Sequence, residues 1–233
     1  PTCMAFAMKV ASGALPIEKC PHMSAEALST LSEATAPPMK TFKVGELSLG
    51  GETVLSRHEK TLVSKTLYAV ELCDCMDEAK QDAVIASIPK VDYERISERM
   101  YVEMVFVNHS ADKSAEDYVA LVNKAKALGR PLVLSCTDVA AAKAAAEALK
   151  GTDFILDGAD ASNYADMSAI ATEAKVLLGV RGTNLEELHA TVEKLEAAGN
   201  KNLILDVGTA SIKDAYAGAV EIRRAALKDG DRS

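Results

Sequence analysis

The sequence predicts an α/β fold in which a parallel sheet is built from repeated βα units. Short runs in which nearly every residue is apolar recur along the chain, as expected for strands that are covered on both faces. Segments with apolar residues at helical spacing lie between these runs. The chain has 233 residues, 48% of them hydrophobic, which is enough for one large core or for one domain with a small appendage.

Two short helices are expected at the front of the chain. The first covers residues 2–12, where apolar residues recur at helical spacing before a glycine. The second covers residues 24–34, with Ser24 as its N-cap, and a Pro-Pro linker follows it. We therefore expect a small module over residues 1–40 and an α/β domain over residues 41–233.

A β-hairpin is expected over residues 42–57, where the pattern alternates around Gly50-Gly51. Six strands are expected after it, at residues 66–73, 101–108, 131–135, 154–156, 176–180 and 203–207. Helical segments are expected at 115–128, 139–149, 162–174 and 184–198. For the last helix, Thr183 and Glu186 form a predicted capping box and Gly199 is the stop signal.

Six strands are fewer than the eight of a closed (β/α)8 barrel, which usually needs about 250 residues. The repeat is therefore either an open doubly wound sheet or an incomplete TIM-type barrel of about six βα units. The end of the chain, shortly after a helix, favours the incomplete barrel slightly.

Cys3 and Cys20 are the most informative residues of the chain. Cys3 begins the first expected helix, and Cys20 lies in a proline-flanked loop after it. Each is placed like part of a metal-binding set, and a [4Fe–4S] cluster needs four thiolates. Because only two are here and the chain opens on a proline, we expect two more cysteines ahead of it. A two-cysteine zinc half-site is the competing chemistry.

The other cysteines give weaker signals. Five cysteines is an odd number, which argues against a disulfide framework and favours reduced thiols in the cytoplasm. Cys73 and Cys75 are expected in the core or at its rim, and not as two ligands of one tetrahedral metal. Cys136 ends a strand alone and is expected to be a small buried residue.

Polar side chains follow the expected strands, at the edge where α/β proteins place their function. They are Asp74, Cys75, Asn108, His109, Cys136, Thr137, Asp157, Gly158, Arg181, Gly182, Asp206 and Gly208. Helix capping is the commoner role for such residues, and it is available to Thr137, Asp138, Thr183 and Asn184. No nucleophile motif, H-E-x-x-H or Walker loop is visible, so no catalytic residue is assigned. His58, in Arg57-His58-Glu59-Lys60, is expected in a solvated turn.

Bulk properties exclude several classes of partner. The net charge is −8 and the pI is about 5.1, which disfavours nucleic acids and anionic membranes. No apolar run is long enough to span a bilayer, and the first residues lack the features of a secretory signal. A cytoplasmic location is therefore expected.

The motif P-T-C-x-x-F-A-M-K-x-A-x-G, with Cys20-Pro21 after sixteen intervening residues, carries a family resemblance. It resembles the N-terminal part of the large (gamma) subunit of the corrinoid iron–sulfur protein, from the acetyl-CoA synthase/carbon monoxide dehydrogenase system. The resemblance continues through Ala36-Pro37-Pro38 and residues 57–60 to residues 221–224, and so covers essentially the whole chain.

The resemblance implies a small cluster domain, a (β/α)8 barrel and a C-terminal corrinoid-binding domain, the last of which this chain lacks. Cys3 and Cys20 match the third and fourth cluster ligands. In the family, cobalt accepts a methyl group from a methyltetrahydropterin, of the methyltetrahydrofolate type, and passes it to the nickel site of acetyl-CoA synthase. The cluster returns Co(II) to Co(I). The implied partners are the small subunit, acetyl-CoA synthase and a methyltetrahydrofolate methyltransferase.

Three alternatives stay open. One is a pterin-binding methyltransferase barrel, in which Asp74, Asn108, Asp157 and Asp206 would hold the pterin ring. The second is an iron–sulfur electron-transfer module without a corrinoid. The third is a structural protein with incidental cysteines. Whether the chain is itself an enzyme is left undecided.

Overall fold

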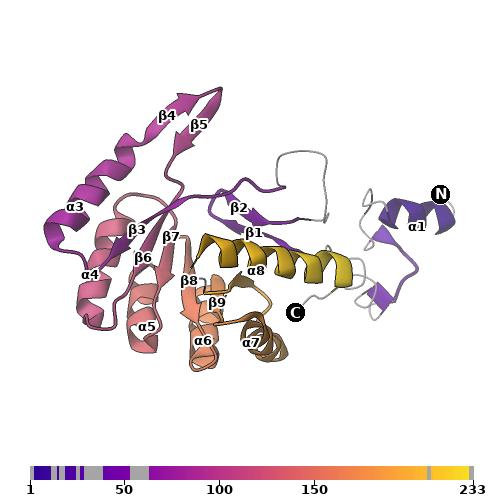
Figure 1. Cartoon of the computed structure of the whole chain (residues 1–233). Helices are drawn as coiled ribbons and strands as arrows, with labels where there is room; N and C mark the ends of the chain where they lie inside the picture. The colour runs from indigo at the N-terminus through magenta and orange to yellow at the C-terminus, as the bar shows by residue number, and fades with distance from the viewer. Residues whose placement is uncertain are drawn as a thin grey trace.

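The structure is a computed structural model, and it describes residues 3–11, 15, 19–24, 27–28, 39–52, 63–208 and 211–230. Its centre is a six-stranded parallel sheet with helices packed against it (Figure 1). The strand order is β10-β9-β8-β7-β6-β3, so the strands follow one another across the sheet as they do along the chain. A doubly wound sheet reverses its strand order at a switch point. The continuous order seen here is that of a barrel wall.

All six predicted strands are confirmed, with ends that shift by a few residues. They are β3 Ala69–Cys73, β6 Met104–Asn108, β7 Leu132–Ser135, β8 Phe154–Ala159, β9 Leu177–Arg181 and β10 Leu203–Asp206. The helices are α3 Glu78–Ser87, α4 Ala115–Lys126, α5 Val139–Ala148, α6 Tyr164–Ala174, α7 Leu185–Ala197 and α8 Ile212–Arg224. A π-helical turn, η3 Ala225–Asp229, continues α8.

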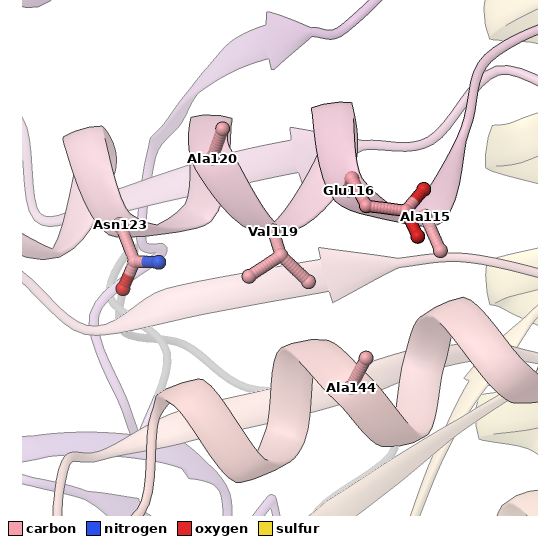
Figure 2. A pocket seen from close by; sticks show the side chains of 6 residues that line it. All are labelled: Ala115, Glu116, Val119, Ala120, Asn123 and Ala144. Atoms are coloured by element: carbon pink, nitrogen blue, oxygen red, sulfur yellow. The ribbon is translucent and has the colours of Figure 1, made fainter.

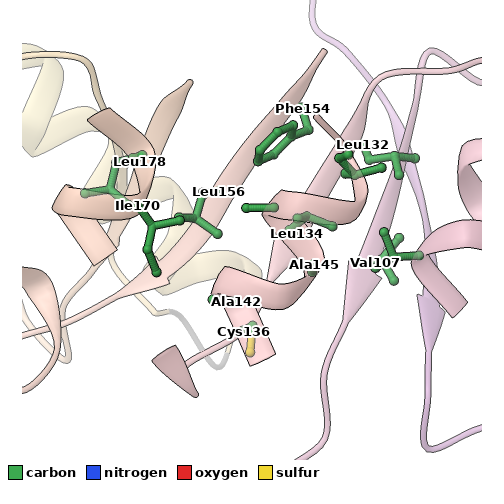
Figure 3. Close-up of a cluster of buried hydrophobic side chains, with 14 of the residues drawn as sticks. Val107, Leu132, Leu134, Cys136, Ala142, Ala145, Phe154, Leu156, Ile170 and Leu178 are labelled. Atoms are coloured by element: carbon green, nitrogen blue, oxygen red, sulfur yellow. The ribbon is translucent and has the colours of Figure 1, made fainter. Parts of the chain in front are cut away.

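The outer face of the sheet carries the main core. Leu132, Leu134, Leu156 and Leu178 are at most 2% exposed, and they pack under the helices (Figure 3). The small alanines of α5, such as Ala142 and Ala145, allow that helix to lie close to the strands. At about 25 cal/mol per Å² of buried apolar surface, this layer is the principal source of stability.

The inner face of the sheet is closed at one end by a β-hairpin, β1 Thr41–Val44 and β2 Leu47–Gly50. Val44 packs with Met104, Ile155 and Leu177, which lie near the amino ends of β6, β8 and β9. Side chains alternate along a strand, so other residues of each strand share the inner face with this apolar layer. Those at the carboxyl ends of the strands are polar. The hairpin therefore covers the amino ends of the strands and leaves the polar carboxyl ends uncovered by it.

The hairpin turn lies five residues earlier than the sequence pattern suggested. The strands turn at Gly45-Glu46, and Gly45 has a φ of +60°, which suits a glycine at the first central position of a two-residue turn. Gly50 and Gly51 instead end the hairpin, where the Gly51 amide donates to the Lys40 carbonyl over 2.9 Å. The expected hairpin over residues 42–57 is thus wrong in its centre, and residues 53–57 lie outside the described ranges.

A second hairpin, β4 Asp92–Arg95 and β5 Glu98–Tyr101, was not predicted. It follows α3 and the short helix η2 Ile88–Lys90, and it projects from the sheet in Figure 1. Charged residues dominate it, so it lacks the apolar alternation that signals a half-buried strand. A paired contact between Arg99 and Asp92 braces its two strands.

The N-terminal helix α1 Cys3–Ala11 confirms the first expected helix and lies apart from the sheet in Figure 1. Ser24 caps a turn as predicted, since its hydroxyl accepts the Ala27 N–H over 3.2 Å. The Pro-Pro linker, most of the second expected helix and residues 57–60, including His58, lie outside the described residues. No helix in the described ranges is both long and apolar enough to cross a membrane.

Candidate functional site at the strand ends

A polar network lies on the inner face, at the carboxyl ends of β7 to β10. Arg181 donates from Nε to Asp206 over 3.0 Å and contacts Asp157 through Nη2 at 3.4 Å. The hydroxyl of the buried Ser135 also hydrogen-bonds Asp157. Strand pairing aligns Asp206 with Arg181 and Ser135 with Asp157. Asp157 and Asp206, two of the predicted strand-end acids, are therefore brought together by the Arg181 guanidinium, which contacts both.

The side chain of Asp157 is 11% exposed, and burial raises the pKa of its carboxyl above the ordinary value of an aspartate. The Arg181 guanidinium and the Ser135 hydroxyl oppose that rise. Gly179 lies beside this carboxyl, and any Cβ there would overlap Oδ1 of Asp157. The missing side chain of Gly179 thus leaves space for a buried acid.

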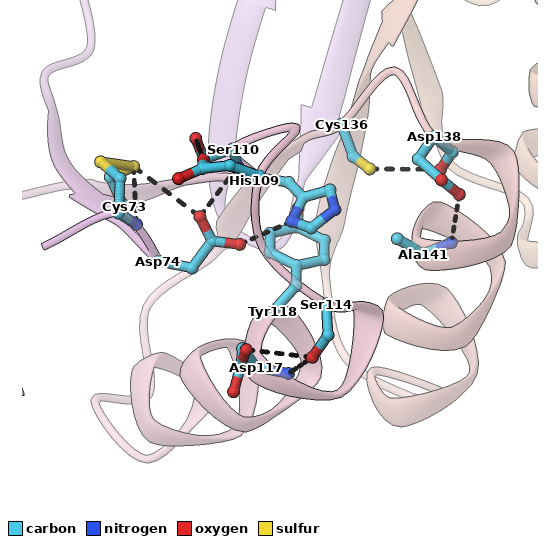
Figure 4. A network of polar contacts seen from close by, with 12 residues as sticks. Cys73, Asp74, His109, Ser110, Ser114, Asp117, Tyr118, Cys136, Asp138 and Ala141 are labelled. Atoms are coloured by element: carbon cyan, nitrogen blue, oxygen red, sulfur yellow. Dashed lines mark hydrogen bonds and ion pairs between the residues drawn. A yellow bond between two sulfur atoms is a disulfide. The ribbon is translucent and has the colours of Figure 1, made fainter.

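A second network lies at the rim, where β3 and β6 end (Figure 4). Oδ2 of Asp74 lies 2.5 Å from Nδ1 of His109, and Oδ1 accepts the Ser110 N–H over 2.8 Å. The side chains of Asp74 and His109 are 2% and 5% exposed. The ring of Tyr118, on α4, packs 4.7 Å from the imidazole, centroid to centroid. A carboxylate that holds Nδ1 in this way fixes the ring and leaves Nε2 as its other polar atom.

Cys73 and Cys75 are joined by a disulfide, which corrects the expectation of separate, reduced thiols. The prediction treated the two as separate residues of one continuous strand, on which residues two apart point to the same face. However, β3 ends at Cys73, and the chain turns through Asp74, with the Met76 amide donating to the Cys73 carbonyl over 3.1 Å. The turn brings the two Cα atoms to 5.1 Å, within the range of disulfides.

Cys136 confirms its expected role as a small buried residue, since it is 2% exposed. Its thiol contacts the Asp138 carbonyl at 3.2 Å, and burial raises its pKa to about 11. A thiol of this kind is a poor nucleophile at neutral pH.

Helix capping accounts for several other strand-end residues. Asp138 caps α5 by accepting the Ala141 N–H. Asn184 caps α7, and Glu187, rather than Glu186, accepts the Thr183 N–H, so the predicted capping box is shifted by one residue. Asn163 was not predicted, although its buried amide donates to the Thr137 and Gly158 carbonyls. Its contact with Thr137 joins residues 26 apart in the sequence, which leaves no local signal.

Cys3 and Cys20 lie where they were expected. Cys3 is the first residue of α1 and is exposed, and Cys20 is half-buried before the turn at Pro21-His22. Both are free cysteines. Among the described residues, no three His, Cys, Asp or Glu side chains are grouped so as to hold a metal ion. The described residues at the front of the chain therefore supply two free thiols, and no described residue can be assigned to a corrinoid.

A surface groove of about 390 Å³ lies between α4 and α5, away from these networks (Figure 2). Ala115, Val119, Ala120 and Ala144 line it, with Glu116 and Asn123 at its edge. The side chains that meet there are mostly methyl groups, so the groove offers no set of convergent polar groups for catalysis.

The fold and these sites define the chain as an α/β protein of the barrel type, with a cysteine-bearing helical segment at its front. The chain belongs to the CO dehydrogenase/acetyl-CoA synthase delta subunit family, whose model matches residues 43–233. A second family model, described as "Putative Fe-S cluster", matches residues 1–22.

Curated relatives carry related names. A corrinoid/iron-sulfur protein large subunit of Moorella thermoacetica is 33% identical, covering 100% of this chain and 53% of the relative. An acetyl-CoA decarbonylase/synthase complex subunit gamma 1 of Methanosarcina thermophila is 30% identical, covering 97% of this chain and 51% of the relative. An acetyl-CoA decarbonylase/synthase complex subunit gamma of Methanothermobacter thermautotrophicus is 28% identical, covering 99% of this chain and 52% of the relative. The chain thus spans about half the length of these relatives.

A solved structure supports the architecture. Dihydropteroate synthase of Thermus thermophilus matches with a TM-score of 0.55 and 13% identity, over 82% of this chain and 74% of that chain. At this identity the likeness concerns the fold alone. The predicted incomplete TIM-type barrel is confirmed, and the open doubly wound sheet is excluded.

Proposed function

We propose that this chain is the cluster and barrel portion of the large subunit of a corrinoid iron–sulfur protein, a methyl carrier. The methyl group would come from a methyltetrahydropterin, of the methyltetrahydrofolate type, and would go to acetyl-CoA synthase. One observation carries the proposal: an iron–sulfur family match at residues 1–22 precedes a barrel of this enzyme family at 43–233 in the same chain.

In this proposal, residues 1–40 form the cluster module and residues 41–233 part of the barrel, and a corrinoid-binding domain lies outside this chain. Cys3 and Cys20 would hold two irons of a [4Fe–4S] cluster, which supplies one-electron transfer when bound. Cys3 is exposed and Cys20 is half-buried, and both lie on one short segment, so both thiols are accessible to a shared cluster. The exposed Met4 and Met8 of α1 would lie near it and limit access of water.

The barrel would act as a scaffold for partner proteins. Its strand-end acids are engaged internally, since Asp157 and Asp206 share Arg181 and Asp74 holds His109. Few acid or base groups are thus left for chemistry of their own. The small subunit, acetyl-CoA synthase and a methyltransferase are the proposed partners, in a cytoplasmic complex.

The exposed side of α8 supports the assignment of residues 41–233 to an incomplete barrel. Ile212, Tyr216 and Val220 recur every four residues on that helix and are 92%, 74% and 44% exposed. Strand β10 pairs with β9 on one side, and its four residues are only half-buried. Both features fit a wall that further βα units would cover.

Isotope transfer tests the proposal. A protein made anaerobically from the reading frame that contains this chain, together with its small subunit, is reduced and mixed with methyltetrahydrofolate carrying a labelled methyl group and with a methyltransferase. The label is expected to become protein-bound and then to move to acetyl-CoA synthase. A protein that binds the pterin but never retains the label would contradict the carrier role and favour a pterin-binding barrel.

A further inference from the structure

We propose that Cys73 and Cys75 form an exchangeable thiol–disulfide site for a dithiol reductant, and that its state controls the contact between Asp74 and His109. The site lies in the barrel portion and is independent of the proposed cluster. The two sites use different cysteines, because the proposed cluster ligands are Cys3 and Cys20.

The position of the bond argues for exchange. A disulfide that closes a long loop restricts the unfolded chain strongly, whereas this one encloses a single residue and restricts it little. The bond is therefore poorly suited to stabilise the fold. The turn already has other braces, since the Gln81 side-chain amide donates to the carbonyls of Cys73 and Met76 over 3.3 and 3.2 Å.

The two sulfurs differ in access. Cys75 is exposed, whereas Cys73 is 4% exposed at the end of β3. An incoming thiolate can therefore reach the Cys75 sulfur, and Cys73 becomes the leaving group. The backbone N–H of Cys75 points at Sγ of Cys73 from 3.1 Å, and a leaving thiolate is stabilised by such a donor.

The reductant is a dithiol, either a small molecule or a dithiol protein. Its thiolate attacks Sγ of Cys75, the bond between Cys73 and Cys75 breaks, and Cys73 leaves as a thiolate that takes up a proton. The second thiol of the donor then attacks the mixed disulfide and releases Cys75 as a thiol. Two electrons and two protons pass to the cysteine pair, and the donor leaves as a disulfide.

The state of the bond reaches the buried pair through Asp74, the single residue that it encloses. Sγ of Cys73 lies 3.8 Å from Oδ1 of Asp74, the oxygen that accepts the Ser110 N–H (Figure 4). In the oxidised state this sulfur carries no hydrogen. After reduction it gains an S–H that competes for Oδ1, and the turn loses its covalent restraint. The contact of Oδ2 with His109 Nδ1 then changes, since both oxygens belong to one carboxylate.

Cys136 provides the matched control. It directly follows β7 at the same edge of the sheet but is buried, and burial raises its pKa to about 11. It is therefore expected to stay a thiol in either state and to resist alkylation in the folded protein.

The test uses the full chain with ¹⁵N-labelled histidine, kept anaerobic and equilibrated with dithiothreitol in its reduced or oxidised form. Alkylation and peptide mass spectrometry are expected to show Cys73 and Cys75 changing together, while Cys136 stays unmodified. The His109 ring nitrogen signals are expected to move on reduction in the wild type and in Cys136→Ser. In the double variant Cys73→Ser/Cys75→Ser, the His109 ring nitrogen signals should not change between reduced and oxidised dithiothreitol.

Two results would overturn the proposal. One is a Cys73 and Cys75 pair that remains reduced in oxidised dithiothreitol, which is read on the wild type and needs no variant to fold. The other is complete exchange that leaves the His109 nitrogen signals in place, which would remove the link to Asp74. Neither result bears on the methyl-carrier proposal, because iron content and label transfer are measured separately.

Discussion

Oδ2 of Asp74 lies 2.5 Å from Nδ1 of His109, and this contact joins the end of β3 to the end of β6. Both side chains are almost fully buried, so water cannot readily replace the hydrogen bond between them. Replacing one partner leaves the other in the protein interior without its counterpart, which typically costs about 1–3 kcal/mol.

We therefore expect Asp74→Asn to lower the free energy of unfolding by about 2 kcal/mol, because an amide replaces the carboxylate that contacts the imidazole and the Ser110 N–H. Urea unfolding followed by circular dichroism measures it. Asp166→Asn, at an exposed position on α6, is the control and should stay within about 0.5 kcal/mol of the wild type. Equal losses in the two variants would show that the buried contact is not stabilising.

Asp157 gives the expected pH dependence. Because burial raises the pKa of its carboxyl, the folded protein keeps a proton there at pH values where the unfolded chain has lost it. The stability contributed by this group is fully present below the unfolded pKa, near 3.9, and is lost as the pH rises through the folded pKa. Asp157→Asn should therefore gain stability relative to the wild type as the pH rises through that window.

The same carboxyl can be titrated directly by ¹³C NMR. Arg181 lowers its pKa, so Arg181→Gln should shift the titration to higher pH. Ser135→Ala should act in the same direction, because it removes a hydrogen bond to the ionised form. A titration that stays in place in Arg181→Gln would mean that the guanidinium does not act on Asp157.

Two glycines separate the effect of close contact from that of backbone conformation. Gly158, on β8, has a φ of +108°, and an added Cβ would lie 2.5 Å from the Cys136 carbonyl oxygen. Gly151 has a φ of +79°, but nothing lies within 4 Å of its added Cβ. Both alanine variants bear the backbone cost of about 1 kcal/mol, and only Gly158→Ala adds a clash.

We expect Gly158→Ala to lose at least about 1 kcal/mol more of unfolding free energy than Gly151→Ala, because β7 and β8 must separate to admit the methyl group. Denaturant unfolding of the two variants side by side gives the difference. Equal losses would indicate that the ends of β7 and β8 adjust freely, and the close contact between Gly158 and the Cys136 carbonyl would then be wrong.

The exposed side of α8 tests the incomplete barrel. Tyr216 is 74% exposed in this chain, so hydroxyl radicals should oxidise it readily. In the protein made from the whole reading frame, we expect strong protection of Tyr216, because further βα units would cover it. Tyr93, 53% exposed on the β4–β5 hairpin, is the internal reference. Equal oxidation of Tyr216 in both proteins would contradict the proposed continuation of the barrel.

The sequence predicted the repeating part of the fold well, because strands covered on both faces leave near-continuous apolar runs such as that of β6. It failed where the signal was polar or depended on distant contacts. The β4–β5 hairpin is too charged to show a strand pattern. The hairpin turn was placed at Gly50-Gly51, although Gly45 alone was needed for the turn.

The candidate site was predicted in its residues but not in its pairings. Polar residues at strand ends were expected, and Asp74, His109, Asp157, Arg181 and Asp206 all lie there. Which of them pair depends on the strand register, and that is set by packing across the sheet. The Cys73–Cys75 bond was missed because the end of β3, and hence the turn between them, could not be located to within one residue.

The most direct test of the proposed function is the iron and sulfide content of the protein made anaerobically from the reading frame that contains this chain. We expect about four irons and four sulfides per molecule for one [4Fe–4S] cluster, with a paramagnetic resonance signal after reduction. Cys3→Ala and Cys20→Ala should lose that signal and most of the iron, whereas Cys136→Ala should keep both. Iron and signal that survive in Cys3→Ala and Cys20→Ala would contradict the assignment of these residues as cluster ligands.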